Sequence, residues 1–128
     1  MASGRSVFDG CIEIATGELM DDDEQTASID EPFTKLTELR FTLDYPFESP
    51  LACEVRNPKG ISVRDVVAAV QVGFRRMYAG ATEEPISGLV NVRVNGDFGE
   101  ALHAITDLVI EGISVDEDEA TLTIDIGS

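Results

Sequence analysis

The single histidine of the chain lies in a short segment that also carries three carboxylates. His103 is flanked by Asp97, Glu100 and Asp107. A histidine close to carboxylates can act as a general base or as a metal ligand. Within a helix, the three- and four-residue spacings of Glu100, His103 and Asp107 would place them on one face. This segment is our candidate for a small carboxylate- and histidine-based enzyme, and a structural or surface histidine is the alternative interpretation.

Two acidic runs supply the oxygen ligands that Ca²⁺ prefers. The metal-site candidates they contain are Asp21, Asp22, Asp23, Asp116, Glu117, Asp118 and Glu119. The second run lacks the central glycine and the glutamate at the twelfth position that an EF-hand requires. Solvated loops are therefore the alternative interpretation of both runs. We predict no organic cofactor.

Two cysteines, Cys11 and Cys53, complete the list of reactive side chains. Each lies in a strand-like pattern without an obvious neighbouring cation, which favours a buried inert thiol over a nucleophile. Two cysteines do not form a disulfide framework in a chain of this size, so we expect two free thiols. The glycines around Asp97 lack the spacing of phosphate-binding loops. We therefore assign no catalytic residues.

The net charge of −16 and the pI near 4.1 limit the partners of this chain. Nucleic acids and anionic membrane surfaces are poor partners, because both are bound through lysine and arginine. No apolar run approaches the roughly 20 residues of a membrane span, and no secretory signal is visible. We expect a soluble intracellular protein. The acidic, lysine-poor composition also fits adaptation to a salty cytoplasm.

The segment from Val55 to Gly80 predicts a strand end, a turn, a capped amphipathic helix and a glycine stop. Ser62 and Asp65 have the spacing of a capping box, with aspartate in the place of the usual Glu or Gln. Apolar residues then recur at helical spacing and form one apolar face: Val63, Val66, Val67, Val70, Phe74, Met77 and Tyr78. We predict the main helix at about 62–79.

Alternating apolar and polar residues predict strands on both sides of this helix. The predicted strands cover residues 39–43, 51–55, 89–94, 105–115 and 120–126. Asn95-Gly96 predicts a hairpin turn, and the acidic loop 116–119 joins the last two strands. The stretch 81–88 is expected to be a connection. Together these elements predict an α+β fold, an antiparallel sheet of about five strands with the helix packed on one face.

The N-terminal quarter differs in composition from the rest. Residues 1–31 are predicted to form an acidic arm, or a short strand at Phe8–Ile14 followed by a loop. Residues 32–128 are predicted to form a single compact α+β domain.

Two stretches carry a resemblance to a known family. They are Arg-Phe-Thr-Leu-Asp-Tyr-Pro-Phe at 40–47 and Cys-Glu-Val-Arg-Asn-Pro-Lys-Gly-Ile-Ser-Val-Arg-Asp-Val-Val-Ala-Ala-Val at 53–70. Residues 36–126 resemble a domain family of unknown function found in fungal proteins and in some large DNA viruses. The tryptophan usual near Tyr45 is absent here, and the segment before Leu108 is shorter. The resemblance implies a fold and no activity, and a virion component if the source is viral.

These observations favour a non-enzymatic protein-interaction or structural assembly module. The sequence has no convergent catalytic set, and exposed edge strands can add a strand from a partner. We expect a protein partner or self-association into an oligomer, with no nucleic acid and no membrane as partner. The alternatives are the enzyme built on Asp97, Glu100, His103 and Asp107, and an acidic salt-adapted or cation-binding protein.

Overall fold

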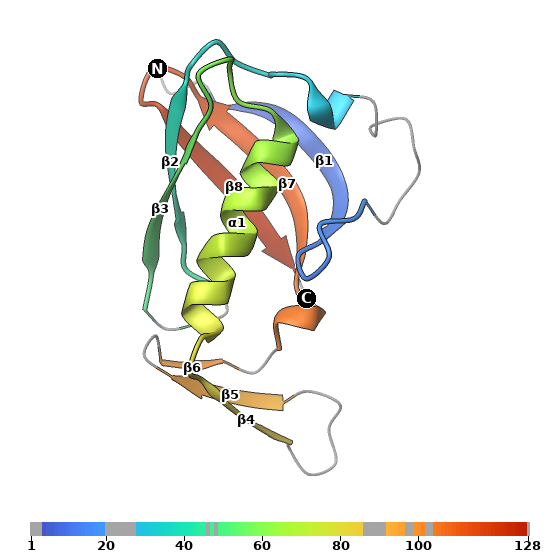
Figure 1. Ribbon diagram of the computed structural model, residues 1–128, viewed down its shortest axis with the longest axis vertical. Helices are drawn as coiled ribbons and strands as arrows, with labels where there is room; N and C mark the ends of the chain where they lie inside the picture. Colours follow the sequence, from blue (N-terminus) through green and yellow to red (C-terminus); the bar gives the residue numbers. More distant parts are fainter. Residues whose placement is uncertain are drawn as a thin grey trace.

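The computed structural model describes residues 4–19, 28–45, 47, 49–85, 92–96, 99–101 and 104–127. It contains a five-stranded sheet in the order β1-β7-β8-β2-β3, with one long helix crossing a single face (Figure 1). The strands are β1 (Arg5–Glu13), β7 (Val109–Asp116), β8 (Thr121–Gly127), β2 (Glu38–Leu43) and β3 (Leu51–Arg56), and the helix is α1 (Val63–Tyr78). The mixed α/β architecture with one main helix agrees with the prediction from the sequence.

The sheet is mixed, so the predicted purely antiparallel arrangement is wrong. Strands β2 and β8 pair in parallel, through Arg40 and Thr121. The backbone N–H of Arg40 donates to the carbonyl of Ala120 at 3.1 Å. The direction of β8 is decided by its hairpin with β7 and by the pairing of β7 with β1. Alternation of side chains reports which face is buried, and it carries no information about the direction of a distant neighbouring strand.

The N-terminal strand belongs to the main sheet. Strand β1 pairs with β7 and contributes Phe8 and Ile12 to the core, and Ile14 just after it is 1% exposed. The 3₁₀ turn η2 (Ser28–Asp30) adds buried Ile29. A strand is therefore present where the sequence predicted one at Phe8–Ile14, and it begins earlier. The acidic run 21–24 lies outside the residues that the structure describes.

The predicted helix is confirmed, with its cap. The Ser62 hydroxyl accepts the Asp65 N–H at 3.2 Å, and the Asp65 carboxylate accepts the Ser62 N–H at 2.9 Å. The side-chain amide of Asn57 donates to the same carboxylate at 2.9 Å. Partial burial opposes ionisation of Asp65, yet these hydrogen bonds hold its pKa below the ordinary value. Beyond the helix, Gly80 has φ +74°, which is the predicted left-handed exit.

The inner face of α1 packs closely on β2 and β3. Val66, Val70, Phe74 and Met77 are fully buried. A Cβ added at Gly73 would lie 2.6 Å from Leu43 Cδ1 and 3.0 Å from Cys53 Sγ. Glycine therefore lets the helix approach the β2–β3 pair at this position.

A second, three-stranded sheet lies beyond the C-terminal end of α1 (Figure 1). It consists of β4 (Thr82–Pro85), β5 (Val92–Gly96) and β6 (Gly99–Ala101). The predicted connection 81–88 thus contains a strand. The hairpin turn is also displaced, because Asn95 and Gly96 lie within β5 and Gly96 pairs with Gly99. Finally, the 3₁₀ turn η3 (Ile105–Asp107) takes the place of the first residues of the strand predicted at 105–115.

Candidate functional site

Glu100 and Asp107, two of the four residues of the predicted enzyme site, lie in different secondary-structure elements. Glu100 lies in strand β6, while Asp107 is exposed in the single turn η3. The Asp107 carboxylate accepts the N–H of Ala104 at 3.3 Å, so it caps that turn. Asp97 and His103 lie outside the described residues. Glu100 and Asp107 are therefore not part of one helix, which was the condition for a shared face, and the enzyme site itself stays a prediction.

The acidic loop between β7 and β8 is tied to neighbouring chain segments. Asp116 Oδ1 accepts the backbone N–H groups of Asp118 and Glu119 at 3.1 and 3.2 Å. The Glu117 carboxylate accepts the Thr34 hydroxyl at 2.7 Å and the Arg5 guanidinium at 3.0 Å. These two contacts lower the pKa of Glu117, that with Thr34 most.

No metal centre is assembled within the part of the chain that the structure describes. Three or more side chains of ligand type do not gather there at any point. Of the predicted metal candidates, Asp116 and Glu117 accept the hydrogen bonds described above, and Asp21, Asp22 and Asp23 lie outside the described residues. The metal prediction therefore remains a prediction for both runs.

Neither Cys11 nor Cys53 forms a disulfide, as the sequence predicted. Cys53 is half-buried under α1, and burial raises the pKa of its thiol while Arg76 opposes the rise only in part. A raised pKa leaves little thiolate at neutral pH. Cys53 is therefore suited to packing and not to nucleophilic attack.

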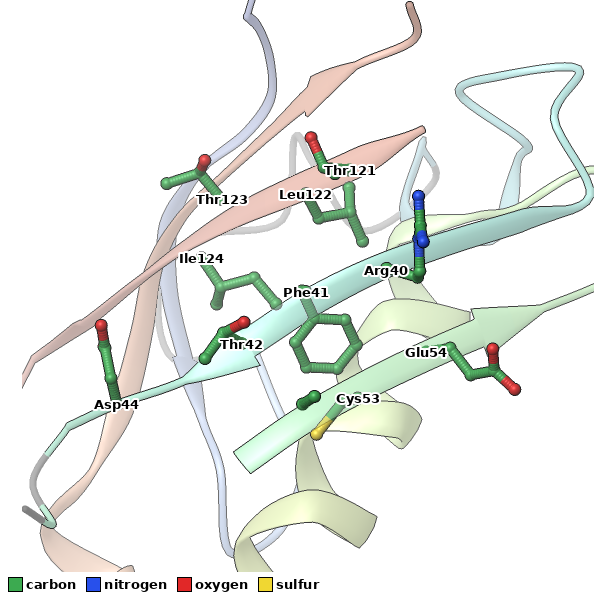
Figure 2. A pocket seen from close by; sticks show the side chains of 11 residues that line it. Arg40, Phe41, Thr42, Asp44, Cys53, Glu54, Thr121, Leu122, Thr123 and Ile124 are labelled. Atoms are coloured by element: carbon green, nitrogen blue, oxygen red, sulfur yellow. The ribbon is translucent and has the colours of Figure 1, made fainter. Parts of the chain in front are cut away.

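An open groove of about 730 Å³ runs over the sheet where β8, β2 and β3 lie side by side (Figure 2). Its charged and hydroxyl-bearing lining residues are Arg40, Thr42, Asp44, Glu54, Thr121 and Thr123, and Cys53 also lines it. The apolar side chains of Leu122 and Ile124 on β8 extend toward Phe41 of β2 (Figure 2). Hydroxyls, two carboxylates and one guanidinium can form hydrogen bonds with a bound molecule, but these lining residues contain no nucleophile paired with a base. The groove has the chemistry of a contact surface.

The two edges of the five-stranded sheet differ in regularity. The ladder of β1 on β7 shifts register between Ser6 and Phe8 and again between Asp9 and Ile12. Strand β3 instead pairs with β2 at six consecutive positions without a shift. Bulges twist an edge away from further pairing, whereas a regular edge remains open to it. Among the strands that the structure describes, β3 is therefore the regular edge of the five-stranded sheet without a further strand beside it.

The alternation of hydrogen-bonded and non-hydrogen-bonded pairs between β2 and β3 shows which backbone groups of β3 face outward. In an antiparallel pair, hydrogen-bonded residues alternate with residues whose N–H and C=O point the other way. Arg40 donates its N–H to the carbonyl of Ala120, the residue just before β8, and therefore away from β3. Its cross-strand partner Glu54 therefore points its own N–H and C=O to the free edge. By the same alternation, the backbone groups of Ala52 and Arg56 also face the free edge.

The side chains along this edge carry both signs of charge. Arg56 pairs with Glu38 at 2.7 Å and with Glu54 at 3.0 Å, and all three side chains are about half exposed or more. Lysine and proline commonly prevent an edge strand from pairing with another chain, and neither occurs within β3. Strand β3 itself carries one glutamate and one arginine, so its own net charge is zero within a strongly acidic chain. Sequence alternation predicted the strand, but its edge position became visible only in the sheet order.

Comparisons with models of protein families, with curated proteins and with solved structures found no match. The resemblance to the fungal and viral domain family thus stays a prediction. No helix within the described part of the chain has both the length and the apolar character needed to cross a membrane.

Proposed function

We propose that this protein is a non-enzymatic interaction module that binds a partner by strand addition at β3. The observation that carries the proposal is the regular, unshifted β3 edge, with the backbone groups of Ala52, Glu54 and Arg56 facing outward. In strand addition, main-chain hydrogen bonds supply affinity and alternate side chains supply specificity. Strand β3 offers both, through its backbone and through the charges of Glu54 and Arg56.

The packing beneath β3 supports this role. Leu51 and Val55 of β3 are 8% and 5% exposed, and Gly73 of α1 leaves no room for a Cβ beside Cys53. Because packing against α1 already orders β3, less conformational entropy is lost when a partner binds. Pro50 before the strand and Pro58 after it lack backbone donors and limit the contact to the length of β3.

The test removes one outward-facing donor at the centre of the edge. Glu54→Pro deletes that N–H, and proline is tolerated on an edge strand where the N–H faces solvent. Glu54→Ala is the matched control, because it removes the same charge and keeps the donor. We expect light scattering and pull-down to show association with the wild type and the alanine variant, and loss with the proline variant.

Two results would overturn the proposal. One is a strictly monomeric wild type that retains no partner. The other is association that Glu54→Pro, folded by circular dichroism, leaves unchanged.

A further inference from the structure

We infer that the strand added at β3 is β3 of a second copy, paired antiparallel about a two-fold axis at Val55. This inference rests on the proposed strand addition and names its partner. The pairing would join two five-stranded sheets into one continuous sheet, with both α1 helices on the same face. The argument comes from register and charge along the strand.

Backbone geometry permits only a few symmetric registers. In a two-fold antiparallel pair, the residues whose backbone groups face the edge must lie opposite one another. On β3 these are Ala52, Glu54 and Arg56. The axis can therefore lie at Cys53, at Glu54 or at Val55.

Charge distinguishes these three registers. An axis at Glu54 places the two Glu54 carboxylates directly opposite each other, which is unfavourable. An axis at Cys53 places Glu54 opposite Ala52 and Arg56 opposite Pro50, so that neither charge gains a partner. Proline does not separate this register from one with the axis at Val55, which places Ala52 opposite Pro58 in the same way. An axis at Val55 places Glu54 of each copy opposite Arg56 of the other. This register alone forms two cross-strand ion pairs.

The side chains that would form these pairs are available. Within one chain, Arg56 and Glu54 pair at 3.0 Å with 63% and 48% of their side chains exposed. Exposed pairs of this kind contribute little to folding, so exchanging partners between two copies costs little. Strand β3 also has no net charge of its own, which favours contact there between two chains that each carry a net charge of −16.

The test uses two single charge reversals and their mixture. In Glu54→Arg, each cross-strand pair becomes Arg opposite Arg, and in Arg56→Glu it becomes Glu opposite Glu. We expect the wild type to sediment as a dimer. For each variant alone we expect the dissociation constant of the dimer to rise by about tenfold or more. Mixing equal amounts of the two variants restores Arg opposite Glu at both positions, so we expect a heterodimer. Recovery on mixing also shows that both variants are folded, and melting curves check each one alone.

The outcomes separate this inference from the proposed function. Single variants that dimerise as well as the wild type would overturn the Val55 register, and so would a mixture that stays monomeric. A monomeric wild type that captures another protein, with capture lost in Glu54→Pro, would overturn the second copy as partner while supporting strand addition. A monomeric wild type without any partner would overturn both.

Discussion

The hydroxyl of Thr34 donates a 2.7 Å hydrogen bond to the carboxylate of Glu117, 83 residues later in the chain. Arg5 donates to the other oxygen of that carboxylate at 3.0 Å, and Arg5 also donates to the carbonyl of Phe33 at 2.9 Å. The acidic loop thus joins β1, the β7–β8 hairpin and the segment before β2. A run of carboxylates that suggests cation binding includes one residue with a structural role.

This contact predicts a pH dependence of stability. Glu117 has a pKa below its ordinary value of 4.5 in the folded protein, mainly because of Thr34 and then Arg5. The contact therefore stabilises the fold above pH 4.5 and loses this contribution as the pH falls through the lower folded value. We expect Glu117→Gln to melt lower than the wild type at pH 7 and to lose less on acidification. Glu119→Gln is the control, and an identical pH profile for all three proteins would contradict the prediction.

The same substitution on the two faces of α1 is expected to change thermal stability by very different amounts. Val67 is 6% exposed on the inner face, whereas Val72 is 64% exposed on the outer face. An aspartate at Val67 would bury an unpaired carboxylate at a cost of several kcal/mol, enough to unfold a marginally stable domain. We expect Val67→Asp to lose the cooperative thermal transition and Val72→Asp to melt close to the wild type. A Val67→Asp protein melting within a couple of degrees of wild type would contradict the helix-face assignment.

The capping box predicts a moderate and local effect. Asp65→Ala removes the acceptor for the Ser62 N–H and for the Asn57 amide. The expected loss in the free energy of unfolding is about 1–2 kcal/mol, as for other helix caps. Urea denaturation measures it, with the exposed turn residue Lys59, changed to alanine, as the control. Equal stability of the two variants would show that the cap contributes nothing.

The charge of the chain predicts a response to salt. With 25 acidic and 9 basic residues, repulsion between like charges opposes the compact state at low ionic strength. The Debye length falls from about 30 Å at 0.01 M to about 3 Å at 1 M. We expect the melting temperature to rise with NaCl between these limits. A flat series would contradict this, and a further gain above 1 M would support salt adaptation.

Calcium tests the acidic runs separately. At matched ionic strength, CaCl₂ should raise the melting temperature more than NaCl if either run binds the cation. Coincident curves would leave both runs as solvated loops.

The sequence by itself determined the elements whose signals are local. The capping residues Ser62 and Asp65, the apolar face of α1 and the glycine exit at Gly80 all act within a few residues of one another. The alternation along β2 and β3 likewise needs only the period of a strand. Each of these predictions depended on short spacings that side-chain geometry fixes directly.

Only the tertiary structure decided how these elements meet. The parallel pairing of Arg40 with Thr121, the placement of β1 beside β7 and the contact of Thr34 with Glu117 join residues far apart in the chain. Local spacing cannot encode such pairings, because they depend on the burial of every element at once. The same reason explains why β3 could be predicted as a strand from its residues, while its position as the regular free edge followed only from the sheet order.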